Sequence, residues 1–220
     1  MHGIRLSLLI LTLSAAAAGL FAISPEDLEA KPPEQWTLEE VEAFLSDSPW
    51  ARIRNLMLAP RGRVYPVQFI VRVRSARPVL LALARRMAAL PDERVRSAAP
   101  PDPSALRRTA DSLTVSGQLL ISVHCTDSAG LDGLNRQSIR TLRDHAYIDL
   151  AGSGRRIRPI AYEAPWKQSL HSAVFHFPRP TIEEAGNRIT FVARFGAPNV
   201  VKLEADFDPA KLRWEGQIEY

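Results

Sequence analysis

The alternation of apolar and polar residues near the end of the chain constrains the fold more than any other feature. In the segment 188–195, core-forming residues such as Ile189 and Phe191 stand at every second position, which is typical of a strand with one buried face. The same period continues over 200–207 and 211–220. Because turn-length links separate the three segments, the sequence predicts an antiparallel meander.

Shorter segments of the same kind fill the middle of the chain. They predict strands at 113–125, 146–150, 157–162 and 172–177, with a glycine-rich turn after the second strand and a short helix over 134–145. Many short strands with close turns are typical of a β-sandwich, although the Cys-Trp-Cys pattern of true immunoglobulin domains is absent. We therefore predict an α+β fold of mostly antiparallel β-structure. Its sandwich-like, loosely Ig-like domain would carry a short N-terminal helix and one or two inserted helices.

An earlier strand is also predicted to have one buried face. Phe69, Val71 and Val73 alternate with residues that include Arg72 and Arg74. The two arginines are therefore expected on the opposite, solvated face, because successive side chains of a strand point to opposite sides.

Two helices are expected between this strand and the β-rich second half. Leu80, Leu83 and Met87 share one face of a helix over residues 78–90, which a proline ends. A second, shorter helix is expected over 104–111.

The strongest local helix signal lies nearer the N-terminus. Thr37 and Glu40 have the spacing of a capping box, and Trp36 and Val41 stand where a hydrophobic staple places them. We predict a helix over residues 38–45 that packs on the core with Trp36 against Val41.

The residues around this helix carry a resemblance. The sequence 31–52 contains Lys-Pro-Pro-Glu-Gln-Trp-Thr and, after the helix, Ser-Pro-Trp-Ala-Arg. It resembles the opening of a group of uncharacterised exported bacterial proteins with a signal peptide, a W-T-x-x-E…S-P-W-A segment and a β-rich domain. The stretches 71–81 and 175–179 look similar too. The resemblance implies export and this architecture, and it implies no activity.

The first 22 residues have the pattern of a secretory signal peptide. Arg5 provides a positive charge, residues 6–13 form an apolar stretch, and residues 14–19 are small. Cleavage is expected within or at the end of that small-residue run, or after Ala22. The alternative is an uncleaved inner-membrane anchor over residues 6–25, which are uncharged and about as long as a spanning helix. The sequence thus predicts export, to the periplasm or beyond the cell.

Cys125 is the only cysteine, which excludes an intramolecular disulfide and lipid attachment beside the apolar N-terminal stretch. It is in phase with Leu119, Ile121 and Val123. We predict a buried cysteine that behaves as a small apolar residue. A reactive thiol and an intermolecular disulfide are the alternatives.

Charge divides the chain that follows residue 22. Residues 23–48 carry eight acidic residues and one lysine, a net charge of −7, whereas residues 49–108 carry 13 arginines and three acidic residues, a net charge of +10. The simplest interpretation is that the acidic segment lies on the arginine-rich part of the same chain. We divide the mature chain into an acidic helical segment, 23–52, and a β-rich domain, 53–220, with a helix near 76–90.

The alternative interpretation is a surface that binds an anionic partner, such as a lipid surface, an acidic glycan or another envelope protein. Nucleic acid is not expected, because no nucleic-acid-binding module accompanies the basic region. Deleting the acidic segment would then expose a basic face and increase salt-sensitive binding to anionic lipid or glycan. The candidate anion-binding residues are Arg61, Arg63, Arg72, Arg74, Arg85 and Arg86.

The sequence contains no catalytic or metal-binding motif: HExxH, CxxC and a glycine-rich phosphate loop are absent. No metal site and no cofactor are therefore expected. Two function classes remain. The first is a non-catalytic binding or structural module of the cell envelope. The second is an enzyme whose site is assembled from dispersed loops, with His124, Arg143, Asp144 and His145 as candidates.

Overall fold

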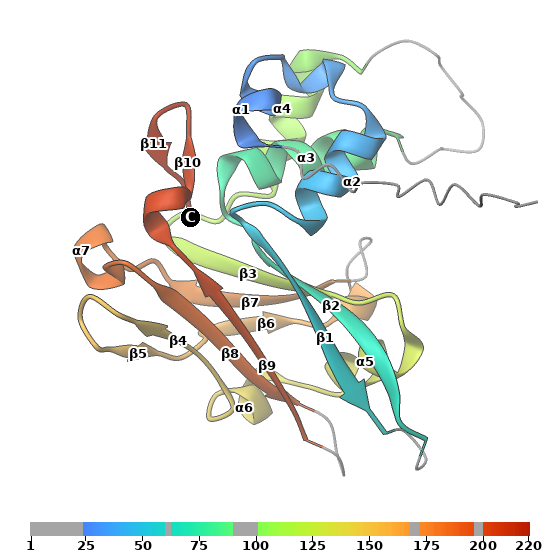
Figure 1. The fold of residues 1–220 in the computed structure, drawn as a ribbon, viewed down its shortest axis with the longest axis vertical. Helices are drawn as coiled ribbons and strands as arrows, with labels where there is room; N and C mark the ends of the chain where they lie inside the picture. The colour runs from blue at the N-terminus through green and yellow to red at the C-terminus, as the bar shows by residue number, and fades with distance from the viewer. Residues whose placement is uncertain (1–23, 60–62, 90–100, 168–171, 196–199) are drawn as a thin grey trace, which may run out of the picture.

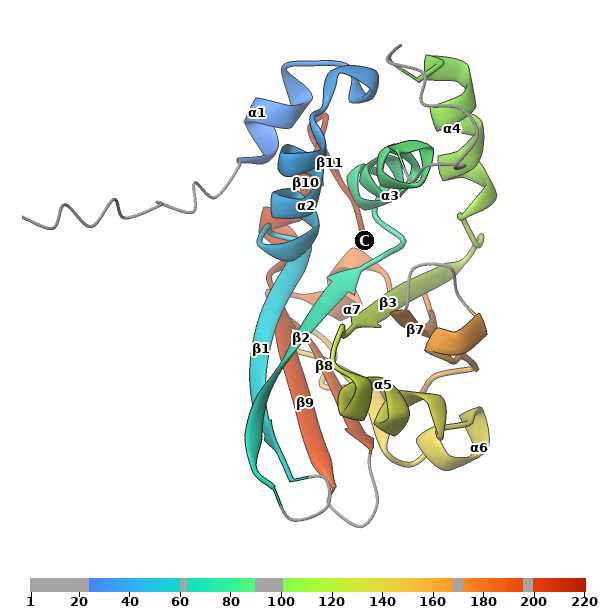
Figure 2. The same ribbon diagram turned by 90° about the vertical axis from the view of Figure 1, so that its right-hand side faces the viewer.

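The computed structural model describes residues 24–59, 63–89, 101–167, 172–195 and 200–220. The predicted signal peptide or anchor lies outside these residues. The fold is α+β, as predicted, and all strand pairs of the described part are antiparallel. Helices α1 to α4 gather at one end of two sheets, and α5 and α6 lie toward the other end (Figures 1 and 2). No helix within the described ranges is long and apolar enough to cross a bilayer.

The larger sheet has five strands in the order β1-β2-β3-β7-β6. The middle strands pair over long registers, for example from Gln118 opposite Pro178 to His124 opposite Ser172. The predicted strand 172–177 is confirmed as β7. The five strands are β1 (Ala51–Leu58), β2 (Tyr65–Val73), β3 (Gln118–His124), β6 (Ala161–Glu163) and β7 (Ser172–Pro178).

The smaller sheet has four strands in the order β5-β4-β8-β9. The strands predicted at 146–150, 188–195 and 200–207 are confirmed as β4, β8 and β9. The members are β4 (Ala146–Leu150), β5 (Arg156–Ile157), β8 (Ile189–Phe195) and β9 (Val201–Phe207).

The predicted meander is wrong in its third strand. After β9 a 3₁₀ helix, η4 (Pro209–Lys211), turns the chain away, and the last residues form a separate hairpin of β10 (Arg213–Trp214) and β11 (Gln217–Ile218). Glu215 and Gly216 both have positive φ, 49° and 75°. Such a turn is typical of a two-residue hairpin loop, which shortens both strands.

Three other expectations about β-structure need correction. The predicted strand 113–125 begins only at Gln118, because the residues after α4 continue into hydrogen-bonded turns. The predicted strand 157–162 is divided into β5 and β6 around Pro159, which cannot donate to a ladder. Strand β1 was not predicted, and the expected domain boundary at residue 52 lies inside it.

The predicted helices are confirmed in outline. The 38–45 helix begins at Leu38 with Thr37 as its N-cap and a complete capping box to Glu40. The single helix expected over 134–145 is two short helices, α5 and α6. The helices are α1 (Pro25–Glu29), α2 (Leu38–Ser46), α3 (Arg77–Ala89), α4 (Pro103–Ser112), α5 (Ser128–Asn135), α6 (Ile139–Leu142) and α7 (Ile182–Ala185), with the 3₁₀ helices η1 (Pro33–Gln35) and η3 (Pro165–Lys167).

Aromatic side chains from the two sheets meet in one core. The rings of Phe175 and Phe191 lie 5.1 Å apart, and those of Phe69 and Phe195 lie 5.6 Å apart, both edge to face. Edge-to-face pairs at this distance add to the free energy gained by burying the rings. The inner faces of the five-stranded and four-stranded sheets therefore pack against each other.

A tryptophan cluster joins the N-terminal helices to the C-terminal hairpin. Trp214 contacts Trp36 and Trp50 at ring distances of 6.0 and 6.4 Å. Trp50 also donates from Nε1 to the carbonyl oxygen of Glu219 at 2.7 Å. Both ends of the described chain therefore belong to one packed core, and Trp36 and Trp50 are structural residues, as expected.

Strand β2 departs from the expected pattern on its second face. Val71 and Val73 are buried, as predicted, but Arg72 is only 2% exposed and Arg74, directly after the strand, only 8%. The prediction that Arg72 and Arg74 lie on the opposite face from Val71 and Val73 is confirmed by the register, but that face is not solvated at these two positions. The C-terminal end of α2 contacts Arg72, and α1 to α4 gather at this end of the sheets (Figure 2).

Candidate functional site

The arginines of residues 49–108 are largely used inside the molecule. Arg52 and Arg54 on β1 donate from Nε to the carbonyl oxygens of Asp206 and Glu204 on β9, at 3.1 and 2.6 Å. Strand β9 is an edge strand of the four-stranded sheet, and an edge exposes unpaired carbonyl groups. The two guanidinium groups satisfy carbonyls of that edge and join the borders of the two sheets.

Three further arginines hold the acidic N-terminal segment. Arg85 donates from Nε to the carbonyl oxygen of Trp36 at 3.0 Å. Arg86 pairs with Glu42 at 3.3 Å, and Arg72 donates from Nε to the carbonyl oxygen of Leu45. The interpretation that the acidic segment lies on the arginine-rich part of the same chain is therefore confirmed.

The six candidate anion-binding arginines do not share one exposed face. Arg61 lies outside the described residues, and Arg63 is exposed in a loop. Arg72, Arg85 and Arg86 have the partners just named. Arg74 differs from all of them, because no hydrogen bond or ion pair from its guanidinium group occurs within the described part of the chain.

Arg74 carries a buried charge that has no hydrogen-bonding partner among the residues that the structure describes. Its Nε is fully buried and has no acceptor, and the residue as a whole is only 8% exposed. Burial lowers the pKa of Arg74, and the charge of Glu163 partly opposes this effect. A buried polar atom without a partner is rare and costly in native proteins. This position therefore needs an explanation beyond packing.

Arg74 belongs to a polar patch on the outer face of the five-stranded sheet. Its backbone N–H donates to the carbonyl oxygen of Leu120 at 2.8 Å, which continues the ladder between β2 and β3. Since side chains alternate along a strand, the register places every second residue of β3, β7 and β6 on the same side as Arg74. We call this group the outer polar patch; it comprises Arg74, Gln118, Ser122, His124, Glu163, Ser172 and His176.

His176 is the buried centre of the outer polar patch. Its Nδ1 lies 2.8 Å from Oε1 of Gln118 on β3, and its Nε2 lies 2.8 Å from Oε1 of Glu163 on β6. Both ring nitrogens are therefore used, and the imidazole joins three adjacent strands. The sequence did not predict this group, because the proximity of His176, Glu163 and Gln118 depends on the strand order.

A second polar contact lies along the same face. Oγ of Ser172 and Nδ1 of His124 lie 3.3 Å apart across a directly opposed pair of β3 and β7. Ser122, on the neighbouring row, is 3% exposed. The patch therefore combines hydroxyl, imidazole, amide, carboxylate and guanidinium groups on one side of the sheet.

The four candidate residues for a dispersed active site are not assembled. His124 is at the end of β3, whereas Arg143, Asp144 and His145 lie together between α6 and β4. Asp144 forms an ion pair with Arg158 at 3.2 Å. The described structure shows no hydrogen bond or ion pair between His124 and the other three.

Cys125 is buried, as predicted. It is 1% exposed, and its Sγ lies 3.7 Å from the carbonyl oxygen of Asp127. Burial raises the pKa of the Cys125 thiol to about 11. The thiolate is the reactive form, so this environment suppresses reactivity at neutral pH.

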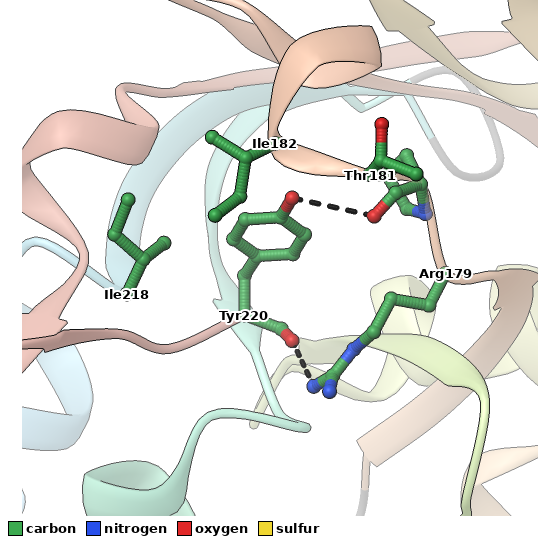
Figure 3. Close-up of a pocket in the computed structure, with 6 residues that line it drawn as sticks. Arg179, Thr181, Ile182, Ile218 and Tyr220 are labelled. Atoms are coloured by element: carbon green, nitrogen blue, oxygen red, sulfur yellow. Dashed lines mark hydrogen bonds between the residues drawn. The ribbon is translucent and has the colours of Figure 1, made fainter.

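A cavity of about 210 Å³ lies beside the last residue, Tyr220, between Arg179 and Ile218. Figure 3 shows the guanidinium group of Arg179 directed to the main-chain oxygen of Tyr220. The Tyr220 hydroxyl donates to the carbonyl oxygen of Pro180 at 3.3 Å. The polar groups of this cavity therefore have partners within the protein.

Within the described ranges, no three histidine, cysteine, aspartate or glutamate side chains gather in a group that could hold a metal ion. No protein-family model, curated protein or solved structure matches the chain.

Proposed function

We propose that the protein is an exported component of the cell envelope that acts as a non-catalytic binding module. The charge and hydropathy pattern of residues 1–22 supports export. The absence of a second cysteine is compatible with this location, since a domain of this size folds without disulfides. The resemblance to exported proteins with a W-T-x-x-E…S-P-W-A segment points to the same compartment.

We further propose that the β-rich part is a sandwich-like, loosely Ig-like domain. The aromatic contacts between the inner faces of the two sheets support this assignment. In sheet packing of this kind, the residues of the outer faces are not part of the core between the sheets.

The observation that carries the binding function is the outer polar patch. Patches of polar groups on the outside of a sheet are normally solvated, yet Ser122, Ser172, His176 and Arg74 are buried here. Burying polar groups is costly unless they form hydrogen bonds, and the buried Nε of Arg74 forms none. A ligand that supplies an acceptor to the terminal nitrogens of the Arg74 guanidinium group would account for a charge in this position.

The proposal differs from the electrostatic surface considered from the sequence. Arginines at positions 52, 54, 72, 85 and 86 are engaged with backbone or carboxylate groups of the protein. Binding would therefore depend on a defined polar patch, and only weakly on the overall basic charge of residues 49–108.

The first experiment tests export. The full chain is expressed with a C-terminal reporter enzyme that is active only outside the cytoplasm, and the product is analysed by N-terminal sequencing. We expect the reporter enzyme to be active, and the mature N-terminus to lie no later than residue 23. An intact N-terminus in the membrane fraction would support the anchored alternative over residues 6–25, and an inactive reporter would contradict export.

The second experiment tests binding without turnover. The purified chain is screened by thermal shift against neutral sugars, sugar acids, short peptides and anionic lipid vesicles, and each hit is recovered and analysed by mass spectrometry. We expect at least one class to raise the melting temperature and to be recovered unchanged. His176→Ala should weaken that shift, whereas the distant exposed variant His145→Ala should not. Chemical conversion of the ligand would favour the enzyme alternative.

A further inference from the structure

We infer that the ligand of the outer polar patch carries a carboxylate group, and that Arg74 binds this group. The inference rests on the proposed binding function and names the chemistry that the patch recognises. It begins with the difference between two arginines on the same side of the sheet. Arg72 and Arg74 are both more than nine-tenths buried. Arg72 has an acceptor in Leu45, and the buried Nε of Arg74 has none.

Within the described residues, no neighbour of Arg74 pairs with its charge. Glu163 is the anionic group that acts on it, but Oε1 of Glu163 lies 2.8 Å from Nε2 of His176. Within the described residues no ion pair joins Glu163 to Arg74. The guanidinium group therefore lies near an anion of the protein without being paired to it, and a second acceptor is needed.

The strand register places His176, Ser122 and Glu163 within two strands of Arg74 on the same face of the sheet. Arg74 stands opposite Leu120, and Leu120 stands opposite His176. Adjacent strands are about 4.8 Å apart, so the Cα atoms of Arg74 and His176 are separated by roughly 10 Å. Ser122 and Glu163 belong to the next row. Leu120, which is 2% exposed, lies between Arg74 and His176, and both ring nitrogens of His176 have partners. A small hydroxy acid would therefore reach the terminal nitrogens of the guanidinium group with its carboxylate and the Ser122 hydroxyl with another oxygen.

The local charge favours a carboxylate over a phosphate. A guanidinium group presents a planar pair of donors that matches a carboxylate in a two-point hydrogen bond. One such group balances one negative charge. A dianion would add a second negative charge close to Glu163, and like charges in a poorly solvated place repel.

The experiment compares matched variants in the same strand region. Wild type, Arg74→Met, Arg74→Lys and Arg72→Met are melted in sodium acetate and in sodium glucuronate, with sodium chloride at equal ionic strength as the reference. Glucose serves as the uncharged counterpart of glucuronate, and sodium phosphate as the dianion. Circular dichroism establishes that each variant is folded before the melts are compared.

We expect both carboxylates to raise the melting temperature of the wild type relative to chloride, and glucuronate to do so more than acetate. Arg74→Met should lose this rise, Arg74→Lys should keep only part of it, and Arg72→Met should keep it in full. The inference is overturned if the wild type does not respond to carboxylates, if Arg74→Met responds equally, or if phosphate exceeds glucuronate. A neutral ligand that binds equally to wild type and Arg74→Met would also overturn it, while leaving the proposed binding function in place.

Discussion

Arg72 donates a hydrogen bond from Nε to the carbonyl oxygen of Leu45, in the last turn of α2. Carbonyl groups in that turn have no partner within the helix, and a cation at this end also interacts favourably with the helix dipole. Burial lowers the pKa of Arg72 to about 9, so the side chain is still protonated at neutral pH. A buried charge from the sheet thus fixes the end of the acidic N-terminal segment.

The first prediction concerns removal of this segment. Deleting residues 24–48 removes the fully buried side chains of Leu28, Trp36 and Phe44 from the core. Each such side chain contributes about 1.5–3 kcal/mol, and a whole domain has only about 5–15 kcal/mol to lose. We therefore expect the truncated protein to lose its cooperative thermal transition. This outcome replaces the expectation that deletion simply exposes a basic face.

A charge-only variant provides the control for the deletion. Glu26→Gln with Glu39→Gln reduces the acidic charge at two exposed positions and leaves the core intact. We expect this variant to be folded and to bind anionic vesicles no better than the wild type. A cooperative transition in the deletion variant would show that the segment is not part of the core.

The second prediction concerns the N-cap of α2. The side chain of Thr37 accepts a hydrogen bond from the backbone N–H of Glu40 at 3.2 Å. Thr37→Ala removes this acceptor and should lower the free energy of unfolding by about 1 kcal/mol. Thr37→Ser keeps the acceptor and should change the free energy by a few tenths of a kcal/mol. Urea denaturation measures both, and equal losses would argue against the capping role.

The third prediction concerns Cys125 and alkaline pH. Burial raises the pKa of the thiol from 9.0 to about 11, so the folded state keeps a proton that the unfolded state loses above about pH 9. The resulting contribution to stability is complete below that pH and is lost as pH rises toward about 11. The free energy of unfolding should therefore fall more steeply over this range in the wild type than in Cys125→Ala. Parallel curves for the two proteins would contradict the assignment.

The sequence predicted the elements that depend on local chemistry. The capping box at Thr37 and the alternation from Ile189 to Phe195 appear where expected. Burial alternates along β1, but the strand was missed because its residue types do not follow that burial: Ile53 and Met57 are exposed, whereas Arg52 and Arg54 are half-buried. The hairpin at the C-terminus was mistaken for a third meander strand, because Trp214 and Ile218 keep the period of two on either side of the turn at Glu215.

The candidate site depended on strand order, which the sequence does not specify. Glu163, His176 and Gln118 come together only because β6, β7 and β3 are neighbours. The alternation along β2 distinguishes two faces of the strand, and Arg72 and Arg74 were assigned to the face away from the core. The alternation does not show that α2 contacts this second face at Arg72. The packing of a helix against a sheet is a tertiary feature, so the burial of these arginines could not be predicted from the alternation of residues along the strand.

The fourth prediction tests the central claim that Arg74 is kept for a ligand and Arg72 for the fold. The measurement is the free energy of unfolding of ligand-free Arg74→Met and Arg72→Met by urea denaturation. Replacing a buried charge that has no partner should be neutral or stabilising, by about 1 kcal/mol or more. Loss of a satisfied donor, which leaves the Leu45 carbonyl without its partner, should destabilise by about 1–3 kcal/mol. We therefore expect Arg72→Met to lose stability and Arg74→Met to keep or gain it, and a loss in Arg74→Met as large as that in Arg72→Met would contradict the account.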